Sequence, residues 1–355
     1  MKKLTPMIGI RIIAIILCLV MLSNCQQQAQ IKPPETIEML SPIEVSIETP
    51  TQGINYLSEV IEIIETNALN RDQVDWKALK MEVLEREKSA TMPSDTYDSI
   101  QYLLLKLNDK HSFFWLPEQA QEFKKQAAEF STEPWGEIYD GKIAYIWNGV
   151  FASGNQDVID QYADDLQQVV IELDAQNPCA WVVDLRDNSG GTVFPMLAGL
   201  GELFRDGVAA MATDSYDHII EFTYKNGMLW EDGILRAQTT HLDFGLSTPA
   251  LEIVVLIGPQ TASSGEMTAL AFEGLPNVTF FGHPTAGLTT ANETYELSDG
   301  AMLFLTTAVF GDRTGKKYGG AIEPDYSLEN PDGGKGTIPG EVFDWLGETS
   351  SCGNQ

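Results

Sequence analysis

The chain has 355 residues, and 51 acidic against 22 basic side chains give it a net charge of −29 at pH 7. This charge disfavours binding to nucleic acid and to anionic lipid surfaces, and it attracts cationic partners over long range. The four cysteines and four histidines follow no spacing that is typical of a metal site. We therefore expect no metal, no cofactor and no nucleic-acid partner.

Residues 1–24 predict a signal peptide that is removed from the mature protein. They contain three basic and no acidic residues, and an apolar run extends from Ile12 to Leu22. The following residues up to Cys25 are similar to a bacterial lipobox, which predicts a lipid anchor at Cys25. A plain N-terminal membrane anchor is the alternative, although so short a run is marginal for crossing a bilayer. The protein is thus expected at the cell envelope, facing outside the cytoplasm.

Residues 25–50 are rich in Gln, Pro, Glu and Thr without a sustained period, which is typical of a flexible tether. After the tether, apolar residues recur at helical spacing. The segments with this spacing are 54–69, 75–88, 94–107 and 117–130. They predict a helical N-terminal subdomain over 51–134.

From residue 135 the pattern changes to alternating strands and helices, which indicates an α/β core with parallel strands. Ile143–Trp147 is a predicted strand, the segment from Val158 to Leu173 a predicted helix, and 181–186 the next strand. We expect this core to extend over 135–335, with a C-terminal helix and tail over 336–355. A predicted hairpin around Asn226-Gly227 is expected to form a cap over the cleft.

Cys179 and Cys352 are the two cysteines that follow Cys25. In an oxidising compartment they can pair as a disulfide. However, Cys179 opens a predicted buried strand and Cys352 lies in a polar tail, so an unpaired buried thiol is an equal alternative.

A short polar turn with the sequence TASSGE occupies residues 261–266, between the apolar run Ile253–Ile257 and an apolar-periodic segment. The pattern predicts a strand, a tight turn and a helix. A small hydroxyl residue at such a turn lies where free N–H groups and the helix dipole favour developing negative charge, as a nucleophile requires. Ordinary helix capping by Ser or Thr is the alternative.

Two further segments supply the other groups that acyl transfer needs. Residues 181–191, WVVDLRDNSGG, predict a buried strand followed by a turn whose paired glycines let backbone N–H groups approach a ligand. Residues 108–115, NDKHSFFW, place His111 at the end of a helix-like stretch. A serine, a histidine and a glycine-rich turn together indicate nucleophilic catalysis, although His111 alone is also compatible with an ordinary helix end.

In this order the three segments resemble the C-terminal processing and tricorn-type serine peptidases. GHPTAG over 282–287 and GAIEPD over 320–325 are also similar to that family, so that the motifs span roughly residues 95–330. The resemblance implies an α/β fold with a Clp protease/crotonase-like βα core, here with an N-terminal helical subdomain and a β-hairpin cap. Members with a PDZ module carry it after the histidine segment, where this chain has only about thirty residues, too few for a domain.

The resemblance implies that Ser263 is the nucleophile and that Ser264 supplies one N–H group of the oxyanion hole. The second N–H group is expected from Gly190, with Gly191 as the alternative. The processing branch of the family uses a lysine base, but Leu288 stands where that lysine falls.

His111 is therefore the expected base, as in the Ser–His branch that includes tricorn and the PDZ-less lantibiotic-resistance peptidases. An imidazole near its reference pKa of about 6.5 accepts a proton at neutral pH, so activity is expected to rise through roughly pH 6–7. His283 is the second candidate base. Lys316 and Lys317 are the nearest candidate lysines in sequence.

Glu323 is the candidate acid that orients His111, because the tricorn branch takes an acid from near this Pro-Asp element. Glu293 and Glu266 are the alternatives, and Asp325 is expected to be structural. The whole pattern predicts a lipid-anchored serine endopeptidase that acts on peptide or protein substrates. A non-hydrolytic binding lipoprotein with the same core is the alternative function.

Overall fold

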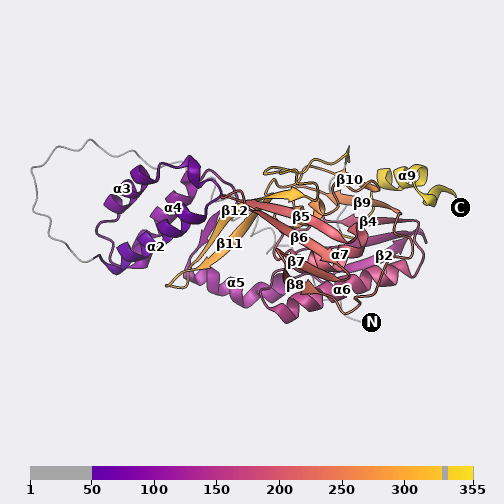
Figure 1. Cartoon of the computed structure of the whole chain (residues 1–355), viewed down its shortest axis with the longest axis horizontal. Coiled ribbons are helices and arrows are strands. Elements are labelled where there is room, and N and C mark those ends of the chain that lie inside the picture. The colour runs from indigo at the N-terminus through magenta and orange to yellow at the C-terminus, as the bar shows by residue number, and fades with distance from the viewer. Residues whose placement is uncertain (1–49, 330–334, 355) are drawn as a thin grey trace, which may run out of the picture. The chain divides into compact units, whose positions relative to one another are not determined.

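The computed structural model describes residues 50–329 and 335–354 (Figure 1). The predicted signal peptide, Cys25 and the tether up to Thr49 lie outside the described residues. Within the part of the chain that is described, no helix combines the length and the apolar character needed to cross a membrane.

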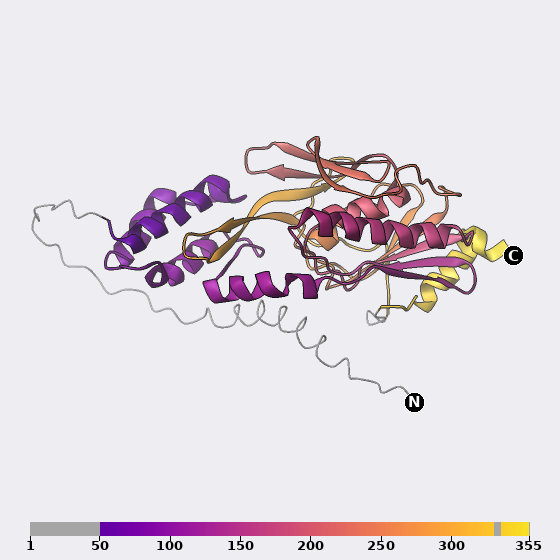
Figure 2. The same ribbon diagram turned by 90° about the horizontal axis from the view of Figure 1, so that it is seen from below.

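The N-terminal part is helical, as the apolar spacing predicts. Its elements are α2 (Gln52–Asn67), η1 (Arg71–Gln73), α3 (Trp76–Arg86), η2 (Pro93–Thr96), α4 (Tyr97–Lys106) and α5 (Pro117–Phe130). Thr51 caps α2, because its Oγ1 accepts a hydrogen bond from the N–H of Ile54. The apolar faces of α2–α4 pack on one another and on Leu303 and Leu305 of a strand from the C-terminal half. Figures 1 and 2 show these helices gathered beside the ribbon of β11 and β12.

A mainly parallel sheet lies at the centre of the α/β core, with the strand order β13-β10-β9-β4-β3-β2. Only β2 and β3 pair in the antiparallel sense among these described strands. The strands are β2 (Trp135–Tyr139), β3 (Ile143–Trp147), β4 (Ala180–Asp184), β9 (Glu252–Ile257), β10 (Val278–Gly282) and β13 (Tyr326–Ser327). The central runs are apolar on both faces because other elements cover both of them.

Three helices pack on one face of this sheet and contact a second sheet on their other side: α6 (Gln156–Asp174), α7 (Phe194–Phe204) and α8 (Ser264–Leu270). The predicted helix from Val158 to Leu173 is present within α6, in which Val158 is 42% exposed and Ile159 is buried. Asn155 caps this helix, and its Oδ1 accepts hydrogen bonds from the first turn.

The second sheet is antiparallel and has the strand order β1-β12-β5-β6-β7-β8, with β11 also paired to β12. Its strands are β1 (Phe113–Trp115), β5 (Gly207–Asp214), β6 (Ile219–Lys225), β7 (Met228–Glu231), β8 (Ile234–Gln238), β11 (Thr290–Glu296) and β12 (Met302–Asp312). The predicted hairpin is present as β6 and β7. Asn226 and Gly227 both have positive φ angles, of 47° and 73°, as a tight hairpin turn requires.

The C-terminal segment covers the opposite face of the parallel sheet. It contains α9 (Gly340–Thr349) and η3 (Ser351–Asn354), and Val342 and Leu346 of α9 are buried against that face. Cys179 and Cys352 form a disulfide, which decides between the two alternatives that the sequence leaves open. The bond ties η3 to the start of β4.

Candidate active site

Ser263 lies in the loop between β9 and α8, directly before the first residue of that helix. Its backbone has φ 53° and ψ −119°, a conformation that residues other than glycine rarely adopt. Such strain persists only where surrounding contacts enforce it, and it clusters at active sites. The half-buried Ser263 makes no side-chain hydrogen bond within the described part of the chain, so its Oγ is available to react.

The glycine-rich turn after β4 packs directly against this serine turn. The N–H of Ala262 donates to the carbonyl oxygen of Asn188 at 3.0 Å, and Ser264 Oγ donates to the carbonyl oxygen of Gly191 at 2.6 Å. A Cβ atom added to Gly190 would lie 3.0 Å from Ser263 Cβ. The structure thus brings together two motifs that are more than seventy residues apart in the sequence.

The two turns differ in which backbone N–H groups remain available for an oxyanion. The N–H of Gly190 donates to Asn188 Oδ1 at 3.0 Å. The N–H groups of Ser264 and Gly191 have no acceptor among the described residues. The N–H group of Ser264, the first expected donor, is therefore free to bind an oxyanion. At the glycine turn the N–H group of Gly191, the alternative donor, is free, whereas that of Gly190 already donates to Asn188.

His111 lies between α4 and β1 and is 8% exposed. Asp109 shapes this loop, because its Oδ1 accepts hydrogen bonds from the N–H groups of His111 at 2.9 Å and of Ser112 at 2.6 Å. The ring Nδ1 of His111 lies 2.8 Å from Thr290 Oγ1 at the start of β11. Asn292 Nδ2 donates to the His111 carbonyl oxygen at 2.8 Å, so both the ring and the backbone of the histidine are fixed by β11.

Burial lowers the pKa of His111 from its ordinary value to about 4, and the charge of Asp109 opposes this only in part. The imidazole is therefore neutral at pH 7 and able to accept a proton. Its Nε2 makes no hydrogen bond within the residues that the structure describes, including Ser263. The backbone of Ser263, through Glu266, and the ring of His111, through Thr290, both connect to the segment 285–290.

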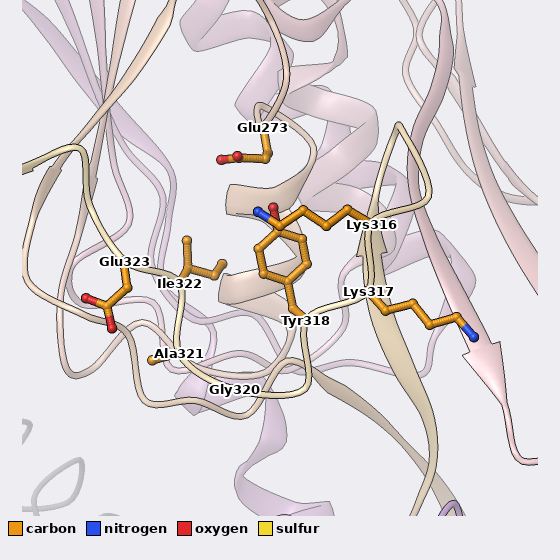
Figure 3. A pocket seen from close by; sticks show the side chains of 8 residues that line it. All are labelled: Glu273, Lys316, Lys317, Tyr318, Gly320, Ala321, Ile322 and Glu323. Atoms are coloured by element: carbon orange, nitrogen blue, oxygen red, sulfur yellow. The ribbon is translucent and has the colours of Figure 1, made fainter.

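In this structure the partner of His111 Nδ1 is Thr290, and no hydrogen bond joins His111 to Glu323 among the described residues. Glu323 is exposed and lines a pocket of about 320 Å³ together with Glu273, Lys316 and Tyr318 (Figure 3). No hydrogen bond or ion pair of Glu323 occurs among the described residues. The orienting role of Glu323 stays a prediction without a contact to support it.

The other candidate acids also contact groups other than His111. Glu266 accepts hydrogen bonds from the backbone N–H groups of Ser263 and of Leu288. Glu293 Oε2 accepts a hydrogen bond from Tyr295 at 2.6 Å. Asp325 has the structural place that the sequence suggests, since its Oδ2 accepts a hydrogen bond from the N–H of Phe280 at 2.8 Å.

The alternative bases have no contact with the serine in the described part of the chain. Lys316 Nζ lies 4.5 Å from the ring centre of Tyr318, and Lys317 Nζ lies 3.9 Å from Asp217. His283 is half-buried and follows β10, and its Nε2 is buried without a partner. The described residues also contain no group of three or more His, Cys, Asp or Glu side chains that could hold a metal ion.

Thr290 and Asp109, which both contact His111, are not among the residues that the sequence motifs mark. An Asp two residues before a histidine is a pattern that forms Asx turns, so local sequence could have indicated Asp109. No local signal marks Thr290, because it is 179 residues from His111 in the chain.

Comparison with known proteins places this chain in a class of peptidases. Residues 142–328 match the model of peptidase family S41. The chain is 31% identical over 282 residues to the nisin-resistance protein of Lactococcus lactis subsp. lactis, an alignment that covers 79% of this chain and 85% of that protein. The chain therefore belongs to peptidase family S41.

Two solved structures and a second relative are also similar. A lipoprotein from Streptococcus agalactiae is 26% identical with a TM-score of 0.69, covering 86% of this chain and 99% of that one. The photosystem II D1 C-terminal processing protease has the same fold at 15% identity, with a TM-score of 0.59 over 79% of this chain and 94% of that one. The carboxy-terminal processing protease CtpA of Bacillus subtilis is 28% identical over 48% of this chain and 33% of its own length. The fold of this chain, with its Clp protease-like core, is thus shared with the two solved structures.

Proposed function

We propose that the protein is a serine endopeptidase in which Ser263 is the nucleophile and His111 the general base. Ser263 Oγ attacks the carbonyl carbon of a peptide bond while His111 Nε2 takes the hydroxyl proton. The imidazolium then gives this proton to the leaving amine, and water repeats the sequence to release the acyl group and restore the serine. The N–H groups of Ser264 and of one glycine in the turn Gly190–Gly191 stabilise the oxyanion.

The conformation of Ser263 is the observation that carries this proposal. A helix cap does not need a positive φ angle, since capping serines have extended backbones. A strained serine whose Oγ is free, at a helix N-terminus and beside a glycine turn with a free N–H group, matches the requirements of an acyl-transfer site. Membership in a peptidase family supports the same reading of the reaction.

A fluorophosphonate probe tests the proposal, because it reacts with activated serines only. We expect one modified residue, Ser263, in the wild-type protein. The variants Ser263→Ala and His111→Ala should lose labelling and peptide hydrolysis while their circular dichroism spectra stay those of the wild type. Absence of labelling in the folded wild-type protein would favour the non-hydrolytic binding lipoprotein instead.

We propose that the enzyme acts outside the cytoplasm, held at the membrane by lipid on Cys25. The disulfide Cys179–Cys352 supports an oxidising compartment, and one structural relative is described as a lipoprotein. Replacing Cys25 by Ser should move the protein from the membrane fraction to the soluble fraction. Unchanged fractionation would mean that the apolar run itself is the anchor.

We propose peptide antibiotics as the substrate class, because the relative that aligns over most of this chain is a nisin-resistance protein. The acidic balance of the chain favours cationic peptides. Incubation of nisin with the wild-type protein and with Ser263→Ala, followed by mass spectrometry, tests this. We expect cleavage by the wild-type protein alone, and intact nisin in both samples would overturn the substrate assignment but not the reaction.

A further inference from the structure

Glu266 is a fully buried carboxylate, with 0% of its surface exposed, in the first turn of α8. Its Oε2 accepts hydrogen bonds from the N–H groups of Ser263 at 2.9 Å and of Leu288 at 2.8 Å. Its Oε1 accepts from the N–H of Gly287 at 2.9 Å and from the hydroxyl of Thr285. All four donors thus come from two segments, the serine turn and the loop 285–288.

Helix capping explains only one of these four hydrogen bonds. A glutamate at this position of a helix commonly accepts from the N–H of the residue at the cap, which here is Ser263. The other three donors belong to a loop 19 to 22 residues further along the chain. Burial alone raises the pKa of Glu266, and hydrogen bonds from all four donors oppose this rise. The number of donors fits a charged carboxylate.

The loop that Glu266 holds leads directly to the partner of the histidine. Leu288 donates its N–H to Glu266, and its carbonyl oxygen accepts from the N–H of Thr290 at 2.7 Å. Thr290 Oγ1 in turn lies 2.8 Å from Nδ1 of His111. The carboxylate of Glu266 is therefore connected to the imidazole of His111 through Leu288 and Thr290 by a continuous series of hydrogen bonds.

We propose that Glu266 is a positioning residue that sets the geometry between nucleophile and base. Its Oε2 holds the backbone of Ser263 in the strained conformation, and the same oxygen fixes the loop whose end orients His111. One side chain thus controls both members of the pair. This inference rests on the proposed roles of Ser263 and His111, and Glu266 itself touches neither the substrate nor the reacting atoms.

The variant Glu266→Gln tests this role, because it keeps the size of the side chain but leaves one acceptor oxygen for four donors. Saturation kinetics with the fluorophosphonate probe separate the maximal labelling rate kinact from the binding constant KI. A misplaced reacting group lowers the rate by about tenfold to a hundredfold. We expect such a fall in kinact, with KI within about twofold of the wild type.

Glu202→Gln is the matched control. Glu202 is a partly buried glutamate, whereas Glu266 is fully buried, and it accepts a hydrogen bond from Tyr224 at 2.8 Å between α7 and β6, away from the serine turn. We expect its kinact to equal that of the wild type. The double variant Glu266→Gln, Thr290→Val should lose less than the product of the two single losses, since both residues act on His111 through one path.

The outcomes separate this inference from the proposed function. Labelling that survives in Ser263→Ala would overturn the function itself. If Ser263→Ala is inert and folded Glu266→Gln labels at the wild-type rate, the function stands and only the positioning role of Glu266 is overturned. A rise in KI at unchanged kinact in Glu266→Gln would also overturn that positioning role.

Amide hydrogen exchange in the wild-type protein decides the question if Glu266→Gln does not fold. The N–H groups of Ser263, Gly287 and Leu288 should exchange together, in one opening event, when one carboxylate holds them. Three independent exchange rates would overturn the proposal.

Discussion

At the scale of single residues, the partner of the histidine distinguishes this site from a triad with an acid. In a Ser-His-Asp triad a buried carboxylate orients the imidazole and stabilises the imidazolium that forms. Here the hydroxyl of Thr290 contacts Nδ1 of His111, and a hydroxyl carries no charge to stabilise the cation. Burial is also why the pKa of His111 falls to about 4, since the charge of Asp109 opposes this fall only in part.

The lowered pKa of His111 predicts the pH dependence of the reaction. A general base works only in its deprotonated form, so the rate rises as pH increases through the pKa of the free enzyme and then levels off. The reference pKa of histidine predicts that the rate rises at pH 6–7. With the pKa of His111 lowered to about 4, we expect the midpoint of this rise near pH 4 instead. Labelling rates at low probe concentration, measured from pH 3 to 8 with circular dichroism to verify folding, check this. A midpoint above pH 6 would contradict the lowered pKa of His111.

Replacing Thr290 by Val should slow labelling by about tenfold or more, because the ring of His111 loses the hydroxyl that fixes its orientation. Thr290→Ser retains the hydroxyl and is the matched control, with a rate close to the wild type. KI should not change in either variant. Equal rates for Thr290→Val and Thr290→Ser would exclude an orienting role for this hydroxyl.

The double variant Lys316→Ala, Lys317→Ala should label at the wild-type rate. Lys317 is half-exposed and Lys316 lies against Tyr318, so neither amine is placed to take the proton of Ser263. Labelling kinetics of the double variant beside His111→Ala check this. Loss of labelling in the lysine variant together with full labelling in His111→Ala would move the assignment to a Ser–Lys mechanism.

At the scale of elements, two turns at the carboxyl ends of β4 and β9 make the site. These strands are neighbours in register, since Asp184 pairs with Leu256, so the segments after them necessarily meet. Ligands of parallel α/β sheets bind at this edge for the same reason. The packing of the glycine turn on the serine turn is thus a consequence of strand order.

Gly190→Ala should reduce kinact by about a hundredfold, because the new Cβ lies 3.0 Å from both Ser263 Cβ and the carbonyl oxygen of Ala262. The φ angle of 105° at Gly190 adds backbone strain for any other residue. Gly154→Ala is the control, since a Cβ there meets no atom within 4 Å. We expect Gly154→Ala to label normally, and a wild-type rate in folded Gly190→Ala would remove the glycine turn from the site.

Local sequence predicted the elements whose pattern is local. The alternation of β3, α6 and β4 and the Asn226-Gly227 turn follow from periodicity and turn chemistry, and the structure has them. The pairing of β1 with β12 joins Phe113 to Phe304, and no periodicity within either segment encodes such a partner. The contact between His111 and Thr290 depends on that same long-range pairing. The motif residues could therefore be found from sequence, and Thr290, the residue that contacts the ring of His111, could not.

At the scale of the whole molecule, the disulfide Cys179–Cys352 closes a loop over a sequence separation of 173 residues. Removing it by Cys352→Ser should lower the free energy of unfolding by about 2–5 kcal/mol, since the unfolded chain gains freedom. Labelling at 25 °C should not change, because α9 covers the face of the parallel sheet opposite to α8. Urea denaturation, with reduced wild-type protein as the control, measures the difference. Equal stability of variant and wild type would contradict this account.

One strand, β12, belongs to two hydrophobic cores. Leu303 and Leu305 complete the core of the helices α2–α4, whereas Ala308 and Phe310 lie in the core beneath the antiparallel sheet. The hydrophobic core of the helices that precede His111 is therefore completed by a strand that lies almost two hundred residues later in the sequence. We therefore expect that α2–α4, transferred alone into another protein, would leave their shared apolar faces uncovered, because Leu303 and Leu305 of β12 would be absent.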